Sequence, residues 1–594
     1  MKLTFKRISA ILILALLIYA GVYVSRIIWF QPSDINVFFD RYHYSALDAR
    51  PELLSEAGHS LLENFADYHS LLTDVSPEGH KRQQWFRQDN VSTLKSYETE
   101  GLSIEEAISR DVLLTYLQNE ITEKDNSLYL DPLSPQGGIH TDLIHFLSYL
   151  HPVTDYETSN SYRTRIRKFE EVIAQIGERL DWQEEKGFYP SRFQVEADLA
   201  FLEKFAAIEP LSHPLYHTFA VRATRVDPTR MNEYQATEIL ESLDKHLAES
   251  LSPALSQLQQ RLSDRLEQCP DSYAKVAYPA GFFASQLGLY TDSTQSPEAL
   301  HTLLTSIQQQ TQSEADSLLA SLPTEGESRG QRLRSLPHQR PDERSENMLK
   351  ELDLQVAAYR KILQGLFGKD VFGKIRMAVD TNQIFLFKRV APSMDKSRRA
   401  RLLINPSGSS LDLETELAYH ALPGHFYRQR RQRSSEQLPE FRRMMDFPAF
   451  NDGWALYAME CLDKDLYMYE NDPQKHLANL QFRLDACAMA RADWGLHQEG
   501  WTEQQAMRYL LAESGLEADA AQAKLLQMMA HPGEAFAGIY GLHQFKEIRR
   551  MVSERLGDSF YPLAFHQEVL RHGSIPFPVL RKALENFIQM TLAS

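Results

Sequence analysis

Helical periodicity is the feature that most restricts how this chain can fold. Apolar residues recur at three- and four-residue spacing between charges in segments such as Thr164–Leu180 and Ala236–Leu262, a pattern typical of amphipathic helices. Proline and glycine punctuate these segments, as at Tyr278–Gly281, and no long Ser/Gly linker divides them. The sequence therefore predicts a mainly helical protein, packed as one large array over residues 31–594 rather than as separate domains.

Three stretches depart from this pattern. Residues 384–390 and 400–405 are apolar runs separated by a polar turn, so they predict strands of a small β-sheet. The edge of such a sheet can bind an extended peptide by strand addition. Residues 323–347 contain almost no large apolar side chains, and we expect an exposed loop there.

The N-terminus carries a targeting signal. Lys2, Lys6 and Arg7 precede an uncharged, mostly apolar run that extends to Ser25. A spanning helix needs about 20 apolar residues, so we expect a transmembrane anchor at residues 8–30. The preceding charges predict a cytoplasmic segment at residues 1–7 and a single-pass inner-membrane protein whose main domain is extracytoplasmic, in the periplasm. A cleaved signal peptide is the alternative, although no Ala-x-Ala site follows the apolar core.

Charge and cysteine content exclude some function classes. The formal net charge of −17 argues against nucleic acid as a partner, because phosphate backbones are bound by basic surfaces. Cys269, Cys461 and Cys487 show no Cys-x-x-Cys spacing and are odd in number. A disulfide framework is therefore not expected, and the cysteines fit small buried apolar residues.

The stretch Leu411–Arg430 is the strongest candidate for a functional site. It indicates a helix with His420 and His425, interrupted by a Pro-Gly pair at 423–424. On an unbroken helix the two imidazoles would lie about 140° apart, but a kink at the Pro-Gly pair can let them converge. Asp452 follows at the start of another expected helix. Two histidines and a carboxylate are the ligand set of a helical zinc hydrolase.

Further acids and one more histidine are candidates for chemistry. Glu416 lies one turn before His420, and Glu460 lies two turns after Asp452, so either could act as a base; both also fit ordinary helix-surface acids. Asp493 and His497 lie four residues apart and could orient a ligand or bind substrate. Ser-His-Asp chemistry has no local support, because no Gly-x-Ser-x-Gly elbow is present.

Several motifs together resemble the bacterial domain-of-unknown-function family eight-eight-five, helical proteins related to the His-Glu-x-x-His zinc peptidases. The similarity extends from about Phe38 to the C-terminus. The motifs that carry it include Gly187-Phe-Tyr-Pro190, Pro423-Gly-His425, Gly453-Trp-Ala-Leu-Tyr457, Gly495-Leu-His497 with Trp501, and Phe565-His566. The resemblance implies a zinc-peptidase-like fold, with zinc as a cofactor and a peptide as substrate or ligand.

The central motif departs from the family pattern His-Glu-x-x-Pro-Gly-His-His, followed by Glu-Gly-Trp-Ala-Leu-Tyr. Without a gap, Tyr419 stands at the first His and His420 at the Glu; with a one-residue deletion, His420 is the first His and the Glu is missing. Asp452 replaces the later Glu, and Glu534 stands where the family has Gln. Loss of the base alone would cost about 10²–10⁴-fold in hydrolysis.

The resemblance thus assigns roles to a set of residues. It implies zinc ligands at His420, His425 and Asp452 and a base at Glu416 or Glu460. The residues expected to bind substrate or support the ligands are Tyr419, Trp454, Tyr457, Asp493, His497, Trp501 and Glu534. Three hypotheses remain: an envelope zinc peptidase, a degenerate relative that binds peptides, and a structural envelope protein. The losses cluster at the site, which slightly favours an inactive or altered protein.

Overall fold

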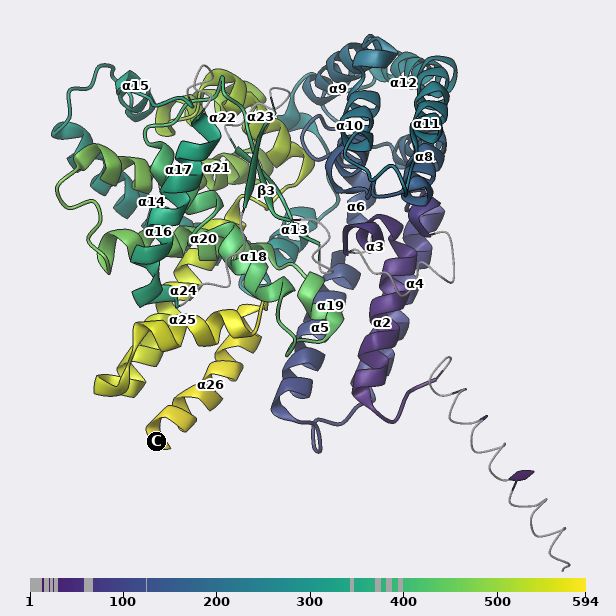
Figure 1. The fold of residues 1–594 in the computed structure, drawn as a ribbon. Coiled ribbons are helices and arrows are strands. Elements are labelled where there is room, and N and C mark those ends of the chain that lie inside the picture. Colours follow the sequence, from purple (N-terminus) through teal and green to yellow (C-terminus); the bar gives the residue numbers. More distant parts are fainter. Residues whose placement is uncertain are drawn as a thin grey trace, which may run out of the picture.

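The computed structural model describes residues 13, 14, 21, 25, 30–57, 68–123, 125–341, 347–368, 375–380, 387–393 and 399–593. Helices dominate these residues, and a three-stranded sheet lies between two helical lobes (Figure 1). The prediction of a mainly helical protein with a small sheet is confirmed.

The structure does not support the transmembrane anchor that was predicted at residues 8–30. No helix in the described part of the chain is long and apolar enough to cross a membrane. Residues 1–7, and most of residues 8–30, lie outside the described residues.

The first lobe has its own hydrophobic core, centred on the long helix α8. Ile166, Phe169 and Ile176 of α8 are fully buried in it, because apolar residues recur on one face of the helix. Asp155 caps the start of α8 in a reciprocal capping box with Thr158. The elements of this lobe are α6 (Asn126–Tyr129), α7 (Ile139–His145), η2 (Phe146–Leu150), α8 (Tyr156–Glu185), α9 (Arg192–Ala206), η3 (Pro210–Ser212), α10 (Pro214–Ala223), α11 (Glu233–His246), η4 (Leu247–Leu251) and α12 (Ser252–Arg265).

The second lobe combines the N-terminal helices with the C-terminal half of the chain. Phe39 of α2 packs against Phe441 of α19, with 5.1 Å between ring centroids, so segments about 400 residues apart share one core. The N-terminal elements are α2 (Ile35–Ala49), α3 (Pro51–Ala57), η1 (Tyr68–Ser70), α4 (Pro77–Lys95) and α5 (Ile104–Glu123).

The rest of this lobe follows α12 in the chain. Its first helical elements are η5 (Tyr273–Lys275), α13 (Phe282–Thr291), α14 (Pro297–Ala320), α15 (Arg329–Ser335) and α16 (Met348–Phe367). After the sheet come α17 (Leu413–His420), α18 (His425–Arg433), α19 (Glu440–Met444), α20 (Pro448–Lys464), α21 (Pro473–Gln498), α22 (Glu503–Glu513), α23 (Ala518–Ala530), α24 (Phe536–Leu556), η6 (Gly557–Ser559), α25 (Pro562–Arg571) and α26 (Phe577–Ala593).

Helices α20 and α24 pack closely because glycine faces glycine where they cross. A Cβ atom at Gly453 would collide with the backbone of Gly541, and one at Gly541 would collide with Ala449. This contact fixes the part of α20 that carries Asp452.

The sheet has the strand order β1-β3-β2. Strand β3 (Arg401–Ile404) lies in the middle, parallel to β1 (Arg376–Val379) and antiparallel to β2 (Phe387–Val390). The two predicted strands therefore exist at residues 387–390 and 401–404, whereas residues 384–386 lie outside the described residues and β1 was not predicted. The hydroxyl of Tyr149 in η2 donates to Asp380 Oδ2 at 2.6 Å, which joins the sheet to the first lobe.

Residues 323–347 were expected to form an exposed loop, but they include helix α15. Ser328 caps this helix in a capping box with Gln331. Arg329 pairs with Asp316 of α14 and Glu513 of α22, and Leu333 and Leu336 are buried in a small apolar cluster, so both charges and apolar packing hold this stretch.

The lobes also meet directly at His531, in the turn before α24. His531 Nε2 lies 3.2 Å from the carbonyl oxygen of Gly137 in the first lobe, and its Nδ1 lies 3.3 Å from the hydroxyl of Tyr290. Gly137 has a φ of +87°, and a Cβ there would overlap the His531 ring. A glycine is thus required at this point of contact.

Candidate functional site

The histidine helix of the sequence is two helices with a break between them. Helix α17 ends at His420 and α18 begins at His425. A Cβ at Gly424 would collide with the carbonyl oxygen of Tyr419, so the chain turns more tightly here than a larger residue would allow. The indole of Trp454, fully buried on α20, donates to the carbonyl oxygen of Pro423 at 3.0 Å. The break is therefore held from behind by the core.

His425 is the most buried of the predicted zinc ligands. Its side chain is 7% exposed, and its Nε2 lies 4.0 Å from Asp452 Oδ1 without a hydrogen-bond partner. Burial lowers the pKa of His425 well below its usual value, and the nearby cation Arg389 and then His420 and Arg428 lower it further. The imidazole is neutral at physiological pH.

Asp452 combines solvent access with loss of hydration. Its side chain is 41% exposed, yet burial raises the pKa of the carboxyl to about 6, against the opposing effect of Arg389. Solvent reaches part of this side chain, and the surrounding protein removes part of its hydration. We call the region around Tyr419, His420, His425, Asp452 and Arg389 the histidine recess.

His420 points to different partners from His425. Arg389 of β2 donates from Nη1 to His420 Nδ1 at 3.0 Å, and His420 Nε2 lies 3.4 Å from Glu416 Oε2. With Nδ1 accepting, the ring proton is on Nε2 and is donated to Glu416. Burial lowers the pKa of His420 despite this carboxylate. Both ring nitrogens are occupied.

Tyr419, rather than His420, lies beside the pair of His425 and Asp452. Its ring packs edge-on against His425 at 4.9 Å between centroids and stacks on Phe482 of α21 at 4.4 Å. Burial raises the pKa of the Tyr419 phenol, and the charge of Asp452 raises it further. This arrangement agrees with the gap-free correspondence, in which Tyr419 takes the place of the family's first His.

Charged groups from other elements surround the recess. Burial lowers the pKa of Lys524 on α23, whereas the charges of Glu534 and Asp452 raise it. Glu534 accepts a hydrogen bond from Gln527 Nε2 at 3.1 Å. On α21, burial raises the pKa of Asp485 to about 7. Both positive and negative groups therefore act on the recess.

The described residues around His425 do not bring three zinc ligands together. Among the described residues, the only three metal-binding side chains whose ligand atoms all lie within 4.8 Å of one another are Glu314, Asp463 and His476. In the recess, His425 and Asp452 are close enough to share an ion, but the third neighbour is the neutral phenol of Tyr419. Catalytic zinc is held by three nitrogen, sulfur or carboxylate ligands, so this set lacks a third ligand.

Several predicted site residues lie in the core or in other contacts. Glu460 binds Arg483 at 3.0 Å and Lys546 at 2.7 Å, so it does not face the histidines. Tyr457 is buried, with its hydroxyl 2.8 Å from His566 Nε2. These side chains support α20 rather than the recess.

Asp493 and His497 form a buried chain beneath the turn that carries Glu534. Asp493 Oδ2 accepts from the backbone N–H of Gly533 at 2.8 Å, and Oδ1 lies 2.8 Å from His497 Nδ1. His497 Nε2 in turn lies 2.6 Å from the hydroxyl of Tyr273. The pair therefore positions the turn. Trp501 packs over Gly495, with the guanidinium of Arg491 4.5 Å from its ring.

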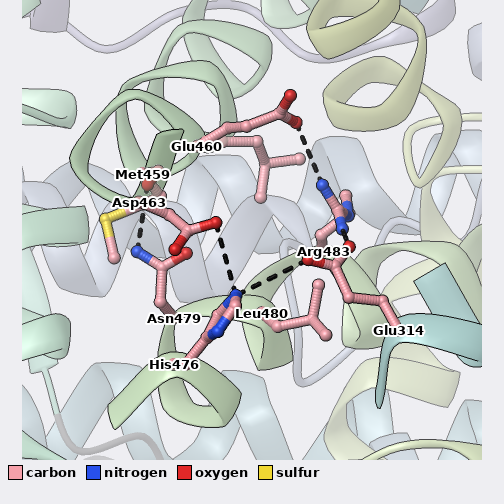
Figure 2. Close-up of a pocket in the computed structure, with 9 residues that line it drawn as sticks. Glu314, Met459, Glu460, Asp463, His476, Asn479, Leu480 and Arg483 are labelled. Carbon is pink, nitrogen blue, oxygen red and sulfur yellow. Dashed lines mark hydrogen bonds and ion pairs between the residues drawn. The ribbon is translucent and has the colours of Figure 1, made fainter. Parts of the chain in front are cut away.

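The cluster of Glu314, Asp463 and His476 was not predicted, because its members come from three helices and share no sequence spacing. His476 Nε2 lies 3.5 Å from Glu314 Oε1 and 3.3 Å from Asp463 Oδ2 (Figure 2). Hydrogen bonding to Asp463 and Glu314 raises the pKa of His476 to about 9. Hydrogen bonding to His476 helps lower the pKa of Glu314 to about 2.

Cations complete this cluster. Arg483 binds Glu314 and Glu460 (Figure 2), and Lys464 lies 2.7 Å from Asp463 Oδ2. A protonated imidazole offers no lone pair to a metal. We therefore interpret Glu314, Asp463, His476 and Arg483 as an ion-pair network between α14, α20 and α21, and call it the Glu314 network.

Comparisons with known proteins agree with this fold. A structure described as "the putative lipoprotein from Colwellia psychrerythraea" matches with a TM-score of 0.86 and 21% identity, over 93% of this chain and 99% of that one. A "putative lipoprotein of unknown function" from Shewanella oneidensis matches with a TM-score of 0.69 and 15% identity, over 93% of this chain and 100% of that one. None of the curated proteins matches the chain.

The family model described as "Bacterial protein of unknown function (DUF885)" matches residues 51–584. This range includes the first lobe, the second lobe apart from α2 and the end of α26, the sheet, the histidine recess and the Glu314 network. The chain therefore belongs to the DUF885 family of bacterial proteins.

Proposed function

We propose that this protein binds a peptide in the histidine recess outside the cytoplasm and does not hydrolyse it with zinc. The observation that carries the proposal is the composition of the recess. Where a zinc peptidase needs a third ligand, Tyr419 packs on His425, and His420 is held between Arg389 and Glu416.

The acids predicted as bases for water activation are bound by other side chains in this arrangement. A base must lie within hydrogen-bond reach of the water that it deprotonates. Glu460 is bound by Arg483 and Lys546, and Glu416 accepts from His420. His420 accepts from Arg389. Each candidate is already paired with another side chain, which supports binding over hydrolysis.

The surroundings favour a peptide as the ligand. Lys524, Glu534 and Arg389 bring both signs of charge to one recess, and a peptide offers both signs at its ends. Strand β2, which carries Arg389, lies at the edge of the sheet, where an extended peptide can align with a strand. The extracytoplasmic location rests on the similar structures, which are described as putative lipoproteins.

The proposal is tested by binding and metal analysis on the same sample. The purified full-length protein is incubated with a pool of tripeptides, and bound peptides are separated by equilibrium dialysis and identified by mass spectrometry. We expect retained peptides, intact after incubation, and less than about 0.1 zinc per chain, against the one ion per chain that a catalytic zinc site holds.

Two results would overturn it. Cleavage of the pool together with about one zinc per chain, lost in His425→Ala, would establish the zinc-peptidase reading instead. Absence of any retained peptide from a folded protein would remove the binding function.

A further inference from the structure

We infer that the space between His425 and Asp452 holds the free ammonium group of the ligand, at the position predicted from the sequence for a zinc ion. This inference rests on the proposed peptide binding and adds to it the end of the peptide that the recess recognises.

The distance between the two side chains suits one shared donor. His425 Nε2 and Asp452 Oδ1 are 4.0 Å apart, and Nε2 has no hydrogen-bond partner although the side chain is 7% exposed. A nitrogen about 2.8 Å from both atoms would make two hydrogen bonds at an angle of about 90°. Such a donor would satisfy a buried polar atom whose desolvation is otherwise uncompensated.

The chemistry of the two atoms selects an ammonium rather than an anion. Asp452 supplies a carboxylate, which repels a second carboxylate and binds a positive donor. A neutral His425 that carries its ring proton on Nδ1 would offer a lone pair at Nε2. An ammonium has three N–H donors and tolerates two such partners, whereas a catalytic zinc ion needs three protein ligands.

The rest of the recess favours a peptide over a simple amine. Arg389 is exposed, and Arg389 and Arg428 both act on Asp452 and His425. The positive charges of Arg389 and Arg428 repel an alkylamine, because it adds a third positive charge and no negative one. A peptide also brings a carboxylate, which Arg389 can bind. Binding of a peptide by its amino terminus therefore gives a partner to the negative charge of Asp452 and to the positive charge of Arg389.

The test compares three pools of tripeptides on the full-length protein by equilibrium dialysis: free, N-acetylated, and C-amidated. Acetylation removes the ammonium and keeps the side chains. We expect the N-acetylated pool to bind about ten- to hundredfold more weakly than the free pool. The C-amidated pool should lose less, because its ammonium is intact.

A variant ties the effect to the site. Asp452→Asn should reduce the preference for the free amino terminus to less than about twofold, while Asp244→Asn, an exposed position on α11 of the first lobe, should leave it unchanged. Thermal unfolding establishes that both variants are folded, and His425→Gln serves as a second probe if Asp452→Asn is not.

The outcomes separate this inference from the proposed function. Equal binding of free and acetylated pools, or an unchanged preference in folded Asp452→Asn and His425→Gln, would overturn the inference and leave peptide binding standing. Failure of all three pools to bind would overturn both.

Discussion

The histidine recess and the Glu314 network contain the same kinds of side chain in opposite electrostatic states. In the network, hydrogen bonds to acids raise the pKa of His476 to about 9. In the recess, burial lowers the pKa of His425 and raises that of Asp452 to about 6. Acids and bases in the network satisfy one another, whereas those in the recess are desolvated without full compensation. The comparison indicates that the network stabilises the fold, and the uncompensated groups of the recess support the proposed ligand site.

The largest effect is expected from substitutions that create a metal site in the recess. The double substitution Tyr419→His with His420→Glu restores the His-Glu-x-x-Pro-Gly-His pattern. Because Tyr419 already lies beside His425 and Asp452, we expect the variant to bind about one zinc per chain, where the natural protein binds less than about 0.1. Metal analysis after gel filtration measures it. His420→Glu alone, which adds no third ligand, is the control. A folded double variant without zinc would show that the backbone of α17 does not suit ligation.

Removal of the support behind the recess should have the next largest effect. Trp454→Ala deletes a fully buried indole and its hydrogen bond to Pro423, and we expect a loss of about 3–5 kcal/mol in the free energy of unfolding. Urea denaturation measures the loss. Trp85→Ala, at a position 68% exposed on α4, should change stability by less than about 0.5 kcal/mol. Similar losses in the two variants would contradict the assignment of Trp454 to the core.

The contribution of the Glu314 network to the free energy of unfolding should depend on pH. The pKa of His476 is raised in the folded protein from an ordinary 6.5 to about 9, so its stabilisation is complete below pH 6.5 and is lost as the pH rises through 9. We expect His476→Gln to be less stable by about 1–3 kcal/mol at pH 6 and equal to the natural protein at pH 10. Urea denaturation at both pH values tests this. His217→Gln, at an exposed position, is the control; a pH-independent difference for His476→Gln would point to lost packing instead.

Substitution of Asp452 in the recess should change the free energy of unfolding in the opposite direction and by a smaller amount. Because the pKa of Asp452 is raised from 3.8 to about 6, its ionisation costs stability as the pH rises from about 4 through 6. Asp452→Asn should therefore be more stable at pH 7.5, by less than about 1 kcal/mol since the side chain is 41% exposed and solvent screens it. At pH 3.5 the two proteins should be equal. A variant that is less stable at pH 7.5 would mean that the carboxylate supports the fold.

The sequence predicted the fold correctly where hydrophobic periodicity determines the secondary structure. Long amphipathic segments such as the one at Thr164–Leu180 became part of α8. Strand β1 was missed because four residues, Arg376–Val379, give too short a pattern, and their parallel partner β3 lies 25 positions away. Helix α15 was missed because its polar residues are held by Asp316 and Glu513 of other helices, although the Ser328 and Gln331 capping box was a local signal.

The sequence predicted the candidate site only in part, because the partners of its residues come from distant segments. The sequence located His420, His425 and Asp452, but it did not indicate that His420 and His425 have separate partners. Arg389, which determines the state of His420, comes from a strand 31 residues upstream. Glu460 follows Asp452 by about 12 Å along α20 and binds Arg483 and Lys546 instead. Such pairings depend on tertiary contacts that no spacing encodes.

The contact between Gly137 and His531 has a consequence for how this chain can vary. The ring of His531 fills the volume that a side chain at 137 would need, and the φ of +87° would strain any other residue at that position. A smaller side chain at 531 would remove the steric overlap but not the backbone strain. The contact between the lobes therefore restricts position 137 of the first lobe more strictly than position 531 of the second.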